Sequence, residues 1–168
     1  MFQKNEYVFY ESGGICKIAD IQISPLEHMP PNTEYYVMQS LHDSNGVMYI
    51  PVNSEQVFLR RLLNREEAER LLGQIVTVEP IAECNAKQLR SKFIDAMRAH
   101  EPIEWVRVIK TVYQRKSNPE RRTQRLSETE RSFDANAKRY LCTELAIALG
   151  QSADEMESFI TDYIKKMA

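Results

Sequence analysis

The side chains best suited to chemistry in this chain are the basic ones that precede a well-marked helix. The stretch 115–125 holds five lysines and arginines and a single acid, Glu120. Directly behind it, Ser127 and Glu130 have the spacing of a capping box, and Gly150 stands where a left-handed C-terminal cap is expected. Clustered cations beside a rigid helix can neutralise the phosphates of a polyanion. The pattern therefore predicts a surface that binds a polyanion.

The charge of the chain is unevenly distributed. The net charge is −2, but residues 85–140 carry fourteen basic against seven acidic side chains, a balance of +7. Each of the stretches 1–62, 63–84 and 141–168 has a balance of −3. A positive middle segment fits an anionic partner, although lysine and arginine also occur on helix faces that only meet solvent. Both interpretations remain open at this point.

Motifs for catalysis or cofactor binding are missing from the sequence. The three histidines, His28, His42 and His100, have no metal-ligand spacing, and neither phosphate-binding glycine loops nor a nucleophile elbow occurs. Gly13-Gly14 reads as a turn between strands. The sequence therefore predicts a protein that is not an enzyme and has no cofactor and no metal.

The cysteines and the N-terminus bear on the compartment. Cys16, Cys84 and Cys142 are odd in number and widely spaced, as expected of small buried side chains in a reducing environment. The first residues lack the layout of a signal peptide, and no apolar run approaches the roughly 20 residues of a membrane span. A cytoplasmic location is expected.

Two halves of the chain follow different periodicities. Residues 1–62 alternate as strands do, and Asn45-Gly46 between two such runs predicts a tight hairpin. Five short strands with tight turns favour a small SH3- or Tudor-like β-barrel that closes its edges. The expected strands are 7–10, 15–21, 35–38, 47–50 and 57–59.

Residues 63–168 have helical periodicity, so we expect an all-α domain of about five helices and an α+β protein overall. Asn64, Asn85, Ser127 and Ser152 are placed to cap helices, and Pro102 suits a first turn. The expected helices are 65–75, 85–100, 102–116, 128–149 and one that begins after residue 152.

Helical spacing also sorts the side chains into faces. In the third helix Trp105, Ile109 and Val112 form an apolar face, opposite Arg107 and Lys110. We therefore expect Trp105 to pack in the core. In the last helix the side chains expected to face inward are Met156, Phe159, Ile160 and Tyr163.

Several short runs along the whole chain form one ordered pattern. They are Tyr7-Val8-x-Tyr10, Gly14-x-Cys16-x-Ile18, Tyr35-Tyr36, Tyr49-Ile50-Pro51-Val52, Val108-Ile109-Lys110-Thr111 and Glu144-Leu145-Ala146. In this order and spacing the chain resembles the CarD/CdnL family of bacterial RNA polymerase-binding transcription regulators. The resemblance implies a Tudor-like polymerase-interacting domain at 1–62 and a helical DNA-binding domain at 63–168.

The resemblance assigns polymerase binding to the strand that precedes the aliphatic-proline pair. Such a strand would pair with the β subunit of RNA polymerase, since an exposed sheet edge supplies backbone hydrogen bonds to a partner strand. A second contact is implied near Ser24, where an arginine can occur in the family. The uncharged serine would make a weaker ionic contact there. The implied polymerase-binding residues are Ser24, Met48, Tyr49, Ile50 and Pro51.

The helical half, by the same resemblance, binds promoter DNA at the upstream edge of the bubble. Its cations would neutralise phosphates largely without reading sequence. The implied DNA-binding residues are Lys87, Arg90, Arg107, Lys110, Arg115, Lys116, Arg121, Arg122, Arg125 and Arg131.

One departure from the family pattern bears on mechanism. Many relatives have a tryptophan before the second helix, where an apolar wedge can hold the duplex edge open. Here Ala82-Glu83-Cys84 stands in that region. We therefore expect phosphate binding without a strong wedge, and weaker stabilisation of the bubble.

Two hypotheses of function follow. In the first, the chain docks on RNA polymerase, contacts promoter phosphates and modulates the stability of the open complex. In the second, it is a protein-only adaptor that binds polymerase or a repair translocase without functional DNA binding. The salt dependence of DNA affinity separates them, because each neutralised phosphate contributes about −0.9 to the log–log slope.

Overall fold

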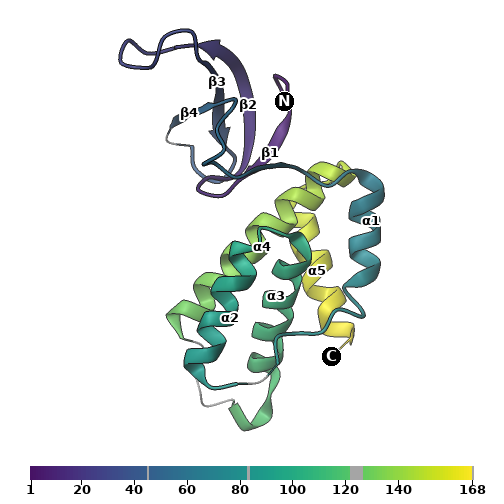
Figure 1. Ribbon diagram of the computed structural model, residues 1–168. Coiled ribbons are helices and arrows are strands. Elements are labelled where there is room, and N and C mark those ends of the chain that lie inside the picture. Colours follow the sequence, from purple (N-terminus) through teal and green to yellow (C-terminus); the bar gives the residue numbers. More distant parts are fainter. Residues whose placement is uncertain (45, 83, 122–126, 168) are drawn as a thin grey trace. The chain divides into compact units, whose positions relative to one another are not determined.

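The computed structural model describes the whole chain except residues 45, 83, 122–126 and 168. The chain divides into two compact units, Met1–Leu62 and Leu63–Ala168. Figure 1 shows strands in the first unit and helices in the second. The boundary falls where the sequence changes from alternating to helical periodicity.

The first unit is an antiparallel sheet of five strands in the order β4-β3-β2-β1-β5. Its strands are β1 (Tyr7–Tyr10), β2 (Gly14–Ile23), β3 (Glu34–Ser40), β4 (Val47–Pro51) and β5 (Leu59–Arg61). Strand β2 carries a register shift between Ile18 and Asp20. The expected α+β class is confirmed, with strands first and helices second.

The sheet is open, where the sequence analysis expected a closed barrel. Strand β4 pairs with β3 and β5 pairs with β1, and no ladder joins β4 to β5 in the described part of the unit. Strand β5 has only three residues and lies two positions later than expected. So short a strand provides few hydrogen-bonding groups for closure, and β4 remains an edge.

One face of the sheet carries a hydrophobic core. Its buried side chains alternate along the strands, as the period of two requires. They are Val8, Cys16, Ile18, Tyr36, Met38 and Ile50. Burial raises the pKa of the Cys16 thiol to about 11, so this cysteine packs as a neutral apolar side chain.

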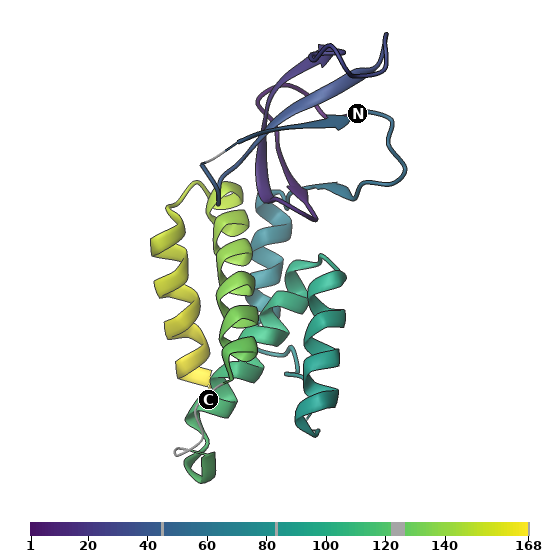
Figure 2. The same cartoon turned by 90° about the vertical axis from the view of Figure 1, so that its left-hand side faces the viewer.

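The second unit contains five α-helices and one short 3₁₀ helix in its described residues. Figure 2 shows α4 and α5 running side by side within this unit. The elements are α1 (Arg65–Gln74), α2 (Ala86–Arg98), α3 (Pro102–Ser117), η1 (Pro119–Arg121), α4 (Glu128–Leu149) and α5 (Ala153–Met167).

Local capping determines where these helices begin and end. The side chains of Asn64 and Asn85 accept hydrogen bonds from the first turns of α1 and α2. Ser127 and Glu130 form the predicted capping box of α4, which ends at Gly150 with a φ of 67°. A left-handed residue at that position suits glycine, which has no side chain to clash. These caps confirm the helix starts expected from the sequence.

Packing of the helical unit agrees with one expectation and corrects another. Trp105 is fully buried and its ring lies 5.6 Å from that of Tyr140, so the expected core position is confirmed. In α5, Met156, Ile160 and Ile164 form the buried stripe, whereas Phe159 is 47% exposed. The inward position predicted for Phe159 is wrong, because the i, i+4 stripe of α5 leaves that residue at its flank.

Candidate functional site

The first candidate site is the open edge of β4. The backbone N–H of Val52 donates to the carbonyl of Glu34 on β3, at 3.0 Å. Backbone groups of an antiparallel strand alternate in direction, so Ile50 and Met48 also turn theirs toward β3. The N–H groups of Val47 and Tyr49 therefore face the open edge and can meet a partner strand.

The side chains of β4 alternate across the sheet in the same way. Ile50 is 8% exposed and belongs to the core, and Met48 packs against that core. Tyr49 lies on the opposite face and is half-buried, while Val47 is 45% exposed. Pro51 has no N–H to offer. Of the four β4 residues assigned to polymerase binding, Tyr49 alone combines an outward backbone donor with a side chain outside this core.

Ser24 closes the base of the loop between β2 and β3. Its hydroxyl donates to the carbonyl of Pro30 at 2.6 Å and accepts from the N–H of Thr33 at 3.3 Å. Its φ of 43° is in the left-handed region, which is costly for a residue with a side chain. The hydroxyl predicted as a weak polymerase contact is thus engaged in shaping its own loop.

The second candidate site is the basic part of the helical unit. Lys87 and Arg90 are exposed on α2, Lys116 is exposed at the end of α3, and Arg131 is exposed near the start of α4. Arg122 and Arg125 lie outside the described residues. Arg121 ends η1, and only its backbone is described.

Lys110 has partners inside the helical unit. Its ammonium donates to the carbonyls of Ile75 and Val78, both at 2.7 Å, and approaches the carbonyl of Val76 at 3.4 Å. These carbonyls lie just beyond the end of α1, where a helix leaves acceptors unsatisfied. Burial lowers the pKa of Lys110, and the Glu79 carboxylate acts in the opposite direction. The sequence predicted a phosphate contact here, and the structure assigns this cation to the linker.

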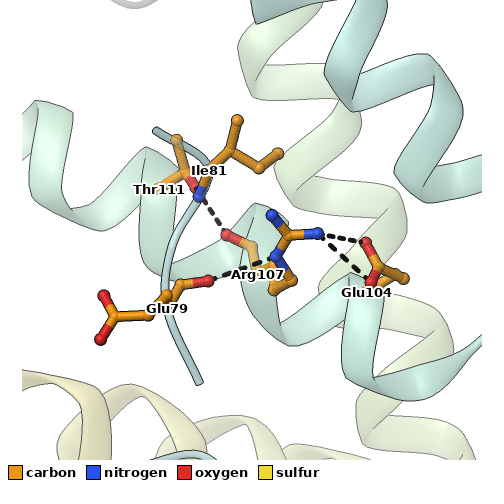
Figure 3. Close-up of polar contacts among 5 residues, drawn as sticks. All are labelled: Glu79, Ile81, Glu104, Arg107 and Thr111. Atoms are coloured by element: carbon orange, nitrogen blue, oxygen red, sulfur yellow. Dashed lines mark hydrogen bonds and ion pairs between the residues drawn. The ribbon is translucent and has the colours of Figure 1, made fainter. Parts of the chain in front are cut away.

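Arg107 and Thr111 bind the next part of the same linker (Figure 3). The guanidinium of Arg107 donates from Nε to the carbonyl of Glu79 at 3.2 Å and pairs through Nη1 with Glu104 at 2.9 Å. The hydroxyl of Thr111 accepts from the N–H of Ile81 at 2.9 Å and donates to the carbonyl of Arg107 at 2.6 Å. Arg107, like Lys110, therefore has a structural partner.

Arg115 joins α3 to the start of α4. Its Nε lies 2.8 Å from Oε1 of Glu130, and both side chains are mostly buried, at 23% and 12% exposure. The other oxygen of Glu130 accepts from the N–H of Ser127 and completes the capping box. One carboxylate thus caps α4 and holds Arg115.

A hollow of about 330 Å³ opens between α2 and α4 beside this ion pair. Leu89 and Phe93 of α2 form its apolar floor, and Arg90 and Arg115 provide its cations. Exposed Lys87 lies one helical turn before Arg90 on α2. Lys87 and Arg90 are thus exposed cations on α2, and Arg90 lines this hollow.

Thr111 was not singled out by the sequence analysis, although the end of α1 gives a signal that its linker needs partners. Helix α1 ends at Gln74 without a glycine cap, so the carbonyls after it need donors from elsewhere. A basic side chain on a later helix can supply such donors, as Lys110 does. Thr111 has the opposite role in the linker, because its hydroxyl accepts from the N–H of Ile81. The sequence alone gives no indication that the two segments meet.

Comparison with known proteins identifies the first unit. Residues 2–63 match the family model described as CarD-like/TRCF RID domain. The N-terminal unit belongs to this domain family. This match supports a CarD-like protein that interacts with RNA polymerase. The curated proteins contain no match to the chain.

Membrane-spanning helices and metal clusters are both missing from the described residues. Among the described residues, no helix is both long and apolar enough to span a membrane. In that same part of the chain, histidine, cysteine, aspartate and glutamate side chains do not gather in groups of three that could hold a metal ion.

Proposed function

We propose that this protein docks on the β subunit of RNA polymerase through the edge of β4 and contacts promoter DNA through the cations around α2, and so modulates the lifetime of the open complex. The match of residues 2–63 to the RID domain is the observation that carries the proposal. Two weak contacts made by one chain reinforce each other through effective concentration. The protein would act as a tether and would have no catalytic step.

The edge of β4 supports the docking part of this proposal. Its ladder to β3 is complete, and Val47 and Tyr49 turn their backbone groups away from it. A partner strand can add there by hydrogen bonding without unfolding the sheet. The short strand also limits the contact, which suits a regulator that binds reversibly.

The charge of the helical unit supports the DNA part. Lys87 and Arg90 are exposed one turn apart, and no acid occurs in the first turn of α2 to neutralise them. A lysine near the positive N-terminal end of a helix is electrostatically unfavourable for the isolated fold. An anionic partner would relieve that cost. Contacts of this kind bind phosphates with little dependence on base sequence.

A protein-only adaptor is the second candidate, favoured by a specific observation. Arg107, Lys110 and Arg115 have partners inside the helical unit, which reduces the number of cations open to DNA. In this alternative the helical unit binds a further protein and contributes no phosphate contacts.

Docking is tested by capture of purified RNA polymerase on the immobilised full chain. Tyr49→Pro removes the outward N–H of β4 and leaves the ladder to β3 intact, because proline is tolerated at a sheet edge. Tyr49→Ala is the matched control, since it loses the ring but keeps the backbone donor. We expect capture by the wild type, a loss of at least tenfold in affinity for Tyr49→Pro, and a smaller loss for Tyr49→Ala.

Failure of the wild type to capture polymerase would overturn the docking proposal. Equal losses in the two variants would assign the contact to the tyrosine ring and remove the role of strand addition. Circular dichroism of both variants verifies that the sheet remains folded.

DNA contact is tested by affinity for a fork-shaped promoter duplex over a range of salt concentrations. Neutralising both α2 cations, as Lys87→Gln with Arg90→Gln, should weaken binding and reduce the log–log slope by about 1.8, at about 0.9 per phosphate. An affinity of the wild type that does not change with salt would reject phosphate contact and favour the adaptor. In transcription assays, the wild type should change the lifetime of the open complex and this double variant should change it less.

A further inference from the structure

The linker between α1 and α2 is held by one polar face of α3. Arg107 and, one turn later, Lys110 and Thr111 stand at positions i, i+3 and i+4 of that face. Together they bind the carbonyls of residues 75, 76, 78 and 79 and the N–H of residue 81. Figure 3 shows Arg107 and Thr111 converging on this segment from α3.

The segment that α3 holds is otherwise without regular structure. It begins after the end of α1 at Gln74 and extends to Ile81. Backbone groups outside helices and sheets need other partners when they are partly buried. Ile75 is fully buried and Ile81 is 6% exposed, so each end of the held segment is also anchored by an apolar side chain.

The last residue bound by α3 precedes the cations that the proposed function uses. Ile81, its last bound residue, lies four positions before the N-cap Asn85, and Lys87 and Arg90 follow in the first turns of α2. The core side chains Leu89 and Phe93 hold α2 from its buried face. On the N-terminal side of α2, Thr111 accepts from the N–H of Ile81, four positions before the N-cap Asn85.

We propose that Arg107, Lys110 and Thr111 form a clamp that positions the start of α2, so that Lys87 and Arg90 meet successive phosphates of bound DNA. The three residues are positioning residues and touch no nucleotide themselves. This inference rests on the proposed DNA contact of α2. It explains why a basic face of α3 is directed at the protein's own backbone.

Thr111 provides the sharpest test because it carries no charge. Thr111→Val keeps the shape of the side chain but leaves the N–H of Ile81 without its acceptor. Thr111→Ala is a second variant with higher helix propensity, which secures the folding of α3. Thr111→Ser retains the hydroxyl and is the matched control. All are measured in the full chain, at a temperature where circular dichroism shows a complete fold.

The readout is the salt dependence of affinity for the same fork-shaped duplex. Since no charge is removed, a purely structural role of Thr111 would leave the slope unchanged. We expect Thr111→Val and Thr111→Ala to reduce the slope by up to about 1.8, the share of two phosphates, and Thr111→Ser to keep it near the wild-type value. Added to Lys87→Gln with Arg90→Gln, the Thr111→Val change should have no further effect.

Two results would overturn the clamp, and they are distinguishable. A wild-type slope in Thr111→Val and Thr111→Ala, with a reduced slope in the α2 double variant, would reject the clamp and leave the proposed DNA contact standing. A wild-type slope in the α2 double variant would reject the proposed contact of α2, and the clamp's function with it. Additive losses in the combined variant would show that Thr111 acts elsewhere than through α2.

Discussion

Helices α2 and α3 lie next to each other in the chain, and both carry basic side chains one turn apart. On α2, Lys87 and Arg90 are exposed. On α3, Lys110 and Arg107 donate to carbonyls of residues 75–79. The sequence spacing of the two pairs is the same, three residues. Their surroundings differ, since the pair on α3 lies against a linker with unsatisfied acceptors.

This difference shows that a basic helix face has two distinct uses. A cation that satisfies buried carbonyls contributes to the folded state, because its hydrogen bonds are partly shielded from water. A cation that faces solvent contributes little to folding and is available to a phosphate. The charge of a side chain in the sequence does not separate these uses. Mutation does separate them, because loss of a structural cation lowers stability and loss of a solvent-facing cation lowers DNA affinity.

The largest effect is expected at Lys110. Lys110→Met keeps most of the apolar stem but removes the ammonium from the carbonyls of Ile75 and Val78. Hydrogen bonds to a charged group contribute about 2 kcal/mol to stability. We therefore expect the substitution to lower the free energy of unfolding by about 2 kcal/mol. Chemical denaturation of the full chain, followed by helical circular dichroism, measures it. An unchanged midpoint would remove the distinction drawn between α2 and α3.

An intermediate effect is expected at the ion pair of Arg115 and Glu130. A double-mutant cycle with Arg115→Met and Glu130→Gln should give a coupling energy of about 1 kcal/mol, since both side chains are mostly buried. Glutamine can still accept from the N–H of Ser127, so the cap of α4 is retained. A coupling energy near zero would place Arg115 with the cations available to DNA.

The smallest effect on stability is expected on α2. Lys87→Met should change the free energy of unfolding by less than about 0.5 kcal/mol, because the side chain is exposed and lies near the positive end of the helix dipole. The same denaturation experiment serves as the matched comparison with Lys110→Met. A loss as large as that of Lys110→Met would indicate a structural role for Lys87 and contradict its availability to phosphate.

Much of the local structure could be predicted from the sequence. The capping box of Ser127 and Glu130, the left-handed Gly150 and the N-caps of α1 and α2 depend on residues at most four apart, so their spacing is visible in the chain. The core position of Trp105 follows from the apolar face of α3.

The remaining features depend on contacts between distant residues, and the tertiary structure alone decided them. Lys110 binds carbonyls 32 to 35 residues away, and no periodicity indicates such a partner. The exposure of Phe159 depends on which neighbours cover the flank of α5. The open edge of β4 depends on how far β5 extends. The sequence by itself determined which segments become helix or strand, because those interactions are local. Packing decided which cations and sheet edges stay available to a partner, because availability depends on what else lies against them.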